Sequence, residues 1–197
     1  MIMDFPDIVN YAKIHDVPII EADSWSTIKQ IIDKQQPKTI LEIGSAIGYS
    51  ALLFAKYSDA EVYTIEKDEH RAEVAARNIS SSEYADRIHF YHDNAFTWKY
   101  PGAVVDLLFI DAAKAQNKAF FERFEPFVRP GGIILTDNMN IRGHIELELS
   151  EIKSRNLKRI VRRTKEYRQW LEQLPGYDTI ILAAGDGLAL TVKKEKL

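Results

Sequence analysis

Apolar and polar positions along the chain follow two alternating periods. Short apolar runs, typical of buried strands, are separated by segments whose apolar residues recur at steps of three and four, as in amphipathic helices. The first pattern predicts strands over residues 39–43, 61–65, 87–91, 105–110, 132–136, 179–183 and 188–192. The second predicts helices over residues 4–15, 24–35, 49–57, 69–79, 115–128 and 145–172.

Strands that alternate with helices indicate βαβ units and therefore a parallel sheet. Only Ala184-Gly-Asp-Gly187 separates the last two predicted strands. So short a connection forms a hairpin, and the last strand must run antiparallel. The pattern predicts an α/β, Rossmann-like fold: a seven-stranded, mostly parallel sheet with a C-terminal antiparallel hairpin strand and helices on both faces. We expect a single domain over 1–197, with the helices of 1–36 covering the cleft of a core formed by 37–197.

The composition is that of a soluble globular protein. The chain has 197 residues, of which 46% are hydrophobic and 28% charged. It has no cysteine, which excludes disulfides, thiolate zinc sites and a thiol nucleophile. We see no signal peptide and no apolar run near the ~18 residues of a membrane span. These features predict a cytoplasmic protein without a membrane partner.

Basic residues are concentrated in one segment of an acidic chain. Residues 153–168 contain eight lysines and arginines and one acid, a net charge of +7, whereas the whole chain carries −3. A local basic stripe influences the choice of partner more than the total charge does. The stripe is either a surface for a polyanion such as RNA or the solvated face of a helix.

Two acids and an amide follow two neighbouring predicted strands. Asp111 comes after the strand over 105–110, and Asp137 and Asn138 come after the strand over 132–136. Ligands of open α/β sheets bind outside the carboxyl ends of the strands, and oxygen donors suit a hard ion such as Mg²⁺. Lys114, three residues beyond Asp111, is a candidate base. The alternative is structural: Asp111 caps a helix, Asp137 holds a turn and Lys114 is solvated.

The first strand–helix turn carries a different signal. Gly44 and Gly48 allow the backbone to approach a ligand, but the Gly-x-Gly-x-x-Gly spacing that cradles a pyrophosphate is missing. The negative charge of Glu42 beside the turn disfavours binding of a phosphate and favours binding of an ammonium group. Glu66 ends the second strand, where an acid can accept ribose hydroxyls. A nucleoside with a cationic part and no phosphate is S-adenosylmethionine. An ordinary βα turn and a nucleotide-dependent oxidoreductase are the alternatives.

Four segments occur in an order that resembles the catechol-type, metal-dependent O-methyltransferases of class I. They are Glu42-Ile-Gly-Ser-Ala-Ile-Gly-Tyr-Ser50, Thr64-Ile-Glu-Lys-Asp68, Phe109-Ile-Asp-Ala-Ala-Lys114 and Asp137-Asn138. Within that family the chain is most similar to the bacterial tRNA 5-hydroxyuridine methyltransferases, which form 5-methoxyuridine at the wobble position. That likeness rests on Ile110-Asp-Ala-Ala-Lys114, on the basic stretch around Arg162-Arg163, and on Tyr177-Asp-Thr together with Gly185-Asp-Gly-Leu-Ala-Leu190.

The resemblance implies roles for individual residues. S-adenosylmethionine would contact residues of the first turn, the second strand end, the turn after the third strand, and Asp111. These residues are Glu42, Gly44, Ser45, Tyr49, Ser50, Glu66, Asp93, Asn94, Ala95 and Asp111. Mg²⁺ or Mn²⁺ would be held by Asp111, Asp137 and Asn138, with Lys114 as the base and Asp111 also catalytic. Asp93 stands where the family usually has glycine, and aspartate tolerates positive φ better than most residues.

The resemblance leaves two substrates open. One is a tRNA anticodon stem-loop carrying 5-hydroxyuridine, and the other is a small hydroxylated aromatic such as a catechol. Both present a hydroxyl beside a second oxygen, so the metal ligands cannot distinguish them. A homodimer is the expected assembly.

Overall fold

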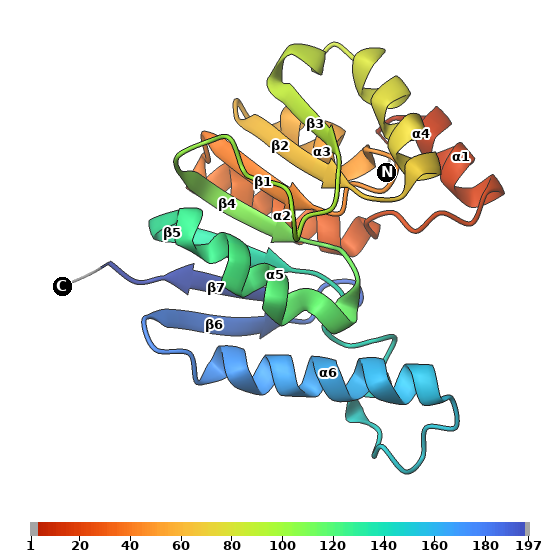
Figure 1. Ribbon diagram of the computed structural model, residues 1–197, viewed down its shortest axis with the longest axis vertical. Coiled ribbons are helices and arrows are strands. Elements are labelled where there is room, and N and C mark those ends of the chain that lie inside the picture. The colour runs from red at the N-terminus through yellow and green to blue at the C-terminus, as the bar shows by residue number, and fades with distance from the viewer. Residues whose placement is uncertain (1–3, 196–197) are drawn as a thin grey trace. The chain divides into compact units, whose positions relative to one another are not determined.

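The computed structural model describes residues 4–195 and contains a seven-stranded mixed sheet with the strand order β3-β2-β1-β4-β5-β7-β6 (Figure 1). The strands are β1 (Thr39–Ile43), β2 (Glu61–Glu66), β3 (Ile88–His92), β4 (Val105–Ile110), β5 (Val128–Thr136), β6 (Tyr177–Leu182) and β7 (Leu188–Lys193). The α-helices are α1 (Pro6–Ile14), α2 (Ala22–Gln35), α3 (Tyr49–Tyr57), α4 (Glu69–Ser80), α5 (Asn117–Phe124) and α6 (Arg155–Glu172). The predicted Rossmann-like fold is confirmed, including the antiparallel hairpin strand at the end.

The chain divides into two compact units, Met1–Gly102 and Ala103–Leu197. The expectation of one domain, with residues 1–36 covering a cleft, stays a prediction. Within residues 4–195, every helix is too short or too polar to span a bilayer.

The first unit contains three parallel strands. β1 pairs with β2, and β2 pairs with β3, so their carboxyl ends lie at the same edge. The apolar side chains of β1 and most of α3 are buried and form the core behind that edge. Asp68 caps helix α4, because its carboxylate accepts a hydrogen bond of 3.0 Å from the Arg71 backbone N–H. Helix α1 lies alongside α4 (Figure 1).

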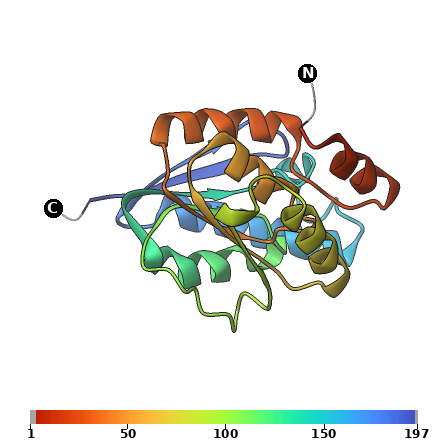
Figure 2. The same cartoon turned by 90° about the horizontal axis from the view of Figure 1, so that it is seen from above.

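The second unit contains β4 and β5 in parallel and β7 antiparallel to both β5 and β6. Helices α5 and α6 lie on the same side of these strands (Figure 2). Phe121 of α5 joins the layers, because its ring lies 5.1 Å from Trp170 of α6 and 5.5 Å from Tyr177 of β6.

Two predicted helices were too long. The helix expected over 145–172 begins only at Arg155, where the Ser154 hydroxyl caps it by accepting from the Leu157 N–H at 3.3 Å. Residues 145–154 instead contain a short 3-10 turn and irregular backbone, so this part of the prediction was wrong. The helix expected over 115–128 ends at Phe124, because Pro126 cannot continue the helical hydrogen bonds, and β5 begins already at Val128.

Candidate active site

The turn after β1 is fastened to the end of β2 by backbone hydrogen bonds. The N–H groups of Gly44 and Ser45 donate to the Ile65 carbonyl at 3.0 and 3.2 Å. Gly44 and Gly48 have φ values of 100° and 83°, which glycine adopts without strain. Side chains at these positions would be strained, so the turn keeps its backbone open at the start of α3.

Glu66 ends β2 and is almost fully buried. One of its carboxylate oxygens, Oε2, accepts from the Ala46 N–H at 3.0 Å, and Oε1 accepts from the N–H groups of Lys67 and Asp68 at 2.9 and 2.8 Å. A carboxylate offers about four lone-pair positions. Three are therefore used by the protein, which leaves one for a ligand hydroxyl in this arrangement.

Glu42 is a fully buried acid with an unpartnered oxygen. Thr64 donates its hydroxyl to Oε2 at 2.5 Å, whereas Oε1 has no hydrogen-bond partner within residues 4–195. Burial raises the pKa of the Glu42 carboxyl to about 7, the Ser50 and Thr64 hydroxyls lower it, and the charge of Glu66 raises it. An unpaired buried oxygen is costly, so a cationic ligand that reaches it would be bound strongly.

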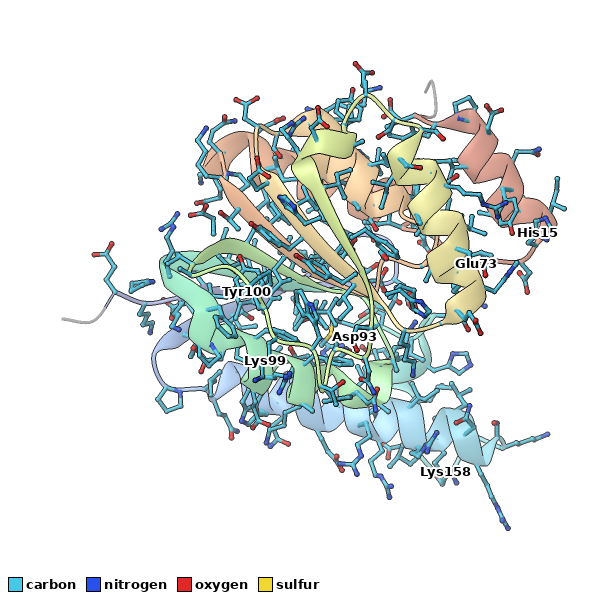
Figure 3. The ribbon with its side chains drawn as sticks, turned by 45° about the horizontal axis from the view of Figure 1, so that its top comes forward. His15, Glu73, Asp93, Lys99, Tyr100 and Lys158 are labelled. Carbon is cyan, nitrogen blue, oxygen red and sulfur yellow. The ribbon has the colours of Figure 1, made fainter. Side chains whose placement is uncertain are left out.

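The turn after β3 is linked to the same strand end. The Asp93 N–H donates to the Glu66 carbonyl at 3.1 Å, and the Asn94 side chain closes a tight turn by accepting from the Phe96 N–H at 3.0 Å. Asp93 lies just beyond β3 (Figure 3) and does not adopt a positive φ, so the replacement of the usual glycine introduces no strain there. Ala95 is buried.

The first unit therefore brings Glu42, Gly44, Ser45, Glu66 and the Asp93 turn to one edge of its strands. We call these residues, with Tyr49, Ser50, Asn94 and Ala95, the nucleoside cluster. Ser50 is buried at the start of α3, and the half-buried Tyr49 ring packs edge-on against Phe5 of the N-terminal segment at 6.4 Å. The Ser45 hydroxyl is buried without a partner among the described residues, like Glu42 Oε1.

The second unit brings the other predicted residues together. Asp111 follows β4, and the Asp137 N–H donates to the Ile110 carbonyl at 3.1 Å, which ties the ends of β4 and β5. Lys114 Nζ donates to Asn138 Oδ1 at 2.5 Å. We call Asp111, Lys114, Asp137 and Asn138 the acidic cluster.

The acidic cluster brings negatively charged side chains close together, and one of them is buried. Asp137 is only 4% exposed, and its pKa is raised to about 7 by burial and by the charges of Asp111 and Asp186, against Lys114 and the Asn138 backbone, which lower it. Two carboxylates that oppose each other's ionisation favour a bound cation. Within residues 4–195 no three His, Cys, Asp or Glu side chains form a metal-ligand group; the acidic cluster offers two carboxylates and an amide.

Three contributors were missed by reasoning from the sequence. Thr64 is the cross-strand partner of Glu42, and the period of two along β2 places it on the same face as Glu66, which was a usable signal. The Ala46 N–H reaches Glu66 because Ala46 has a φ of 46°, which no sequence pattern indicated. Asp186, interpreted as part of a hairpin turn, is close enough to Asp137 to raise its pKa.

Comparison with known proteins identifies the family. The sequence matches the O-methyltransferase family over residues 10–194. The chain belongs to this family.

Individual O-methyltransferases are similar to this chain in sequence and in structure. This O-methyltransferase is 30% identical over 166 residues to a catechol O-methyltransferase of Mycobacterium tuberculosis, covering 80% of this chain and 72% of that protein. A crystal structure of a candidate caffeoyl-CoA O-methyltransferase from Staphylococcus aureus is 36% identical, with a TM-score of 0.90 over 95% of this chain and 91% of that one. An O-methyltransferase from Bacillus cereus in complex with SAH shares the fold at 24% identity, with a TM-score of 0.81 over 96% of this chain and 90% of that one.

The enzyme is therefore an O-methyltransferase of the caffeoyl-CoA and catechol type. Helix α6 carries a basic surface. Arg155, Arg159, Arg162 and Arg163 are exposed, and Lys158 lies on the outer side of the helix (Figure 3). The apolar residues of this helix lie on its inner side. Val161, Thr164, Tyr167 and Leu171 are buried, and Leu157 and Ile160 are half-buried.

Some of the basic residues of α6 have structural partners. Lys165 Nζ donates to the Leu147 carbonyl at 2.7 Å. Arg162 and Arg163 lie 3.9 and 3.6 Å from the carboxylate of Glu166, at an exposed position where such pairs are weak. Helix α6 therefore remains strongly positive, because it carries seven lysines and arginines against two acids, Glu166 and Glu172.

Proposed function

We propose that this O-methyltransferase depends on Mg²⁺ or Mn²⁺ and methylates 5-hydroxyuridine at the wobble position of tRNA. The catalytic part rests on the acidic cluster, and the choice of substrate rests on the basic outer face of α6. A cytoplasmic location and a homodimer remain predictions.

The nucleoside cluster fits S-adenosylmethionine. Glu42 Oε1, buried and unpartnered, would accept a hydrogen bond from the ammonium of the methionine part, with Ser45 as a further partner. Glu66 has one lone-pair position left for a ribose hydroxyl. The turn formed by Asp93, Asn94 and Ala95 would border the adenine. The fit therefore rests on two buried atoms without partners among the described residues, Glu42 Oε1 and Ser45 Oγ, and on the remaining lone-pair position of Glu66.

The donor set of the acidic cluster fits a hard divalent ion. Asp111, Asp137 and Asn138 would hold it through oxygen atoms, leaving positions for water or substrate. A bound divalent ion supplies positive charge that orients a hydroxyl and lowers its pKa. Asn138 Oδ1 now accepts from the ammonium of Lys114, so a cation already lies against one of the proposed ligands.

Lys114 would serve as the base. Its Nζ donates to Oδ1 of Asn138, one of the residues that would hold the ion, and would therefore lie near a substrate hydroxyl bound at this cluster. Within the second unit, Asp111 and Asp137 would fix the position of that hydroxyl, so part of the contribution of the chain is orientation of the reacting oxygen.

The basic face of α6 favours RNA over a small molecule. Phosphate contacts position a nucleic acid without reading its sequence, which suits exposed arginines along one helix. The target base lies unpaired in an anticodon loop and needs no duplex to be opened. A catechol needs no such face. The second candidate, a small-molecule catechol methyltransferase, is favoured by the name of the Mycobacterium relative.

One experiment separates the two candidates. The purified enzyme is given S-adenosylmethionine, Mg²⁺ and either tRNA from cells that lack this protein or a simple catechol. Mass spectrometry of tRNA nucleosides should show 5-hydroxyuridine converted into 5-methoxyuridine. Conversion of the catechol alone would reject the tRNA proposal and favour the second candidate. Failure on both would reject both substrates.

A further inference from the structure

The segment after the acidic cluster has an unusual backbone. Asn138, Ile141 and Arg142 have φ values of 60°, 50° and 51°, and Gly143 has 79°. Left-handed conformations are uncommon for residues other than glycine and are strongly disfavoured for a β-branched residue such as Ile141. Such a conformation persists only where the surroundings hold it.

The β6–β7 hairpin supplies the contacts that hold this segment. The Met139 N–H donates to the Gly187 carbonyl at 2.9 Å, and the Asn140 N–H donates to the Asp186 carbonyl at 2.7 Å. The Arg142 N–H donates to Oδ1 of the Asp186 side chain. Three backbone N–H groups of the segment therefore donate hydrogen bonds to two residues of the hairpin turn.

The hairpin turn is also shaped for this contact. Gly187 has a φ of 82°, and a Cβ there would lie 2.7 Å from Cγ of Asn140. Only glycine allows the two segments to approach so closely. Ile141, 6% exposed, packs with Ile152 and Val161 on the inner side of the same segment. Among these hydrogen bonds, the one that Asp186 Oδ1 accepts from the Arg142 N–H involves a side chain, and it can be removed without changing the backbone.

We propose that Asp186 is a positioning residue, which clamps residues 138–143 and thereby fixes the Asn138 amide and the Asp137 carboxylate in the geometry that binds the divalent ion. The proposal rests on the proposed function only for the identity of that ion. The clamp itself is a property of the protein without ligands. Asp186 acts here through the Arg142 N–H and not as a ligand.

Three proteins test the clamp: the parent, Asp186→Ala and Asp186→Asn. Alanine removes the acceptor, whereas asparagine keeps Oδ1 in place and removes only the charge. A matched control is Asp178→Ala, which removes another aspartate of the same hairpin, one that forms an exposed ion pair with Lys194.

The first measurement is amide hydrogen exchange without metal or cofactor. Asp186→Ala should speed exchange of the Arg142 amide, and of the neighbouring Met139 and Asn140 amides, by about tenfold, the loss expected for one hydrogen bond to a charged group. Asp186→Asn should exchange close to the parent rate, and the control should match the parent. Unchanged exchange in Asp186→Ala would overturn the clamp whether or not the enzyme uses a metal.

The second measurement is Mn²⁺ binding, followed by the spin-resonance signal of the free ion. Asp186→Ala should bind Mn²⁺ about tenfold more weakly than the parent, with unchanged affinity for S-adenosylmethionine, and Asp186→Asn should recover most of the affinity. Equal weakening in both variants would show that charge matters, and would overturn the positioning role. A parent that binds no Mn²⁺ would reject the proposed metal site and the role of Asp186 in it, while the exchange experiment would still judge the clamp.

Discussion

Lys114 Nζ donates a hydrogen bond of 2.5 Å to Oδ1 of Asn138, the amide proposed as a metal ligand. One oxygen is therefore shared between the proposed base and the proposed metal site. Asn138 would supply this oxygen to a divalent ion, for which the Lys114 ammonium would then be a competitor. The availability of the base is thus coupled to occupation of the metal site.

The first prediction concerns this base. Lys114→Ala should lower kcat by about 100-fold or more, because proton transfer by a positioned side chain contributes at least that much. Mn²⁺ affinity should stay the same or increase, since a competing positive charge has gone. Steady-state kinetics and Mn²⁺ titration measure the two effects. Lys118→Ala, an exposed lysine of α5 paired with Glu122, is the control. A kcat near that of the parent would show that the metal alone activates the hydroxyl.

The second prediction concerns the metal. EDTA should abolish methyl transfer, and Mg²⁺ or Mn²⁺ should restore it. Asp137→Ala should lose turnover but retain cofactor affinity, because Asp137 belongs to the acidic cluster and not to the nucleoside cluster. Activity assays and calorimetry with S-adenosylmethionine provide the measurements. Full activity in EDTA would remove the metal from the proposal.

Helices and strands were predictable from the sequence where hydrophobic pattern and turn residues indicate the same boundaries. They were not predictable where contacts with distant segments determine the backbone conformation. The run from Thr39 to Ile43 was assigned correctly because apolarity and the following glycine coincide. Residues 145–154 were wrongly assigned to a helix. Ile145 and Ile152 are buried there, but in a short 3-10 turn and irregular backbone, where the Leu147 carbonyl accepts a hydrogen bond from Lys165 of α6. No local sequence pattern predicts such a contact.

The candidate site shows the same division. Strand ends gave Glu42 and Glu66 in the first unit and Asp111 and Asp137 in the second, since neighbouring parallel strands within each unit end at the same edge. The contribution of Asp186 depends on a contact between segments more than forty positions apart. Its sequence context, glycine on both sides, indicates only a turn.

The third prediction concerns Glu66. The parent should bind S-adenosylmethionine in the micromolar range, about 8 kcal/mol. Glu66→Ala should weaken this binding strongly, because the carboxylate both offers a lone pair to the ligand and holds the Ala46 N–H of the first turn. Calorimetry checks the affinity. Glu69→Ala, an exposed acid of α4, should bind like the parent; equal binding by Glu66→Ala would contradict the assignment of the nucleoside cluster.

The fourth prediction concerns stability and pH. The pKa of Glu42 is raised by burial from 4.5 to about 7, so the folded protein holds this proton more tightly than the unfolded chain does. Folding therefore takes up a proton between these values, and stability decreases as the pH rises through this window. Below this window Glu42 is protonated in both the folded and the unfolded state. Above it Glu42 is ionised in both states, and the full loss of unfolding free energy is present.

Glu42→Gln, which resembles the protonated acid, should remove this dependence. Relative to the parent, the variant should gain roughly 1–3 kcal/mol of unfolding free energy between about pH 5 and pH 8. Denaturant unfolding without cofactor at both pH values measures the difference. The same variant should bind S-adenosylmethionine more weakly, because the charge that would meet its ammonium is gone. Parallel pH profiles for parent and variant would contradict the raised pKa.

The last prediction concerns the outer face of α6. Reversing Arg162 and Arg163 to glutamate turns two exposed cations beside Glu166 into an acidic patch. tRNA binding should weaken at low salt, and the dependence of affinity on salt concentration should flatten, because fewer phosphate counterions are released. Filter binding at several salt concentrations measures both. Lys29→Glu with Lys34→Glu makes the same change in total charge on α2 of the other unit and serves as the control. Methylation of a free catechol, if the parent performs it, should be equal in all three proteins. If the α6 reversal leaves affinity and salt slope unchanged, the stripe is only a solvated helix face, and the small-molecule candidate becomes the better proposal.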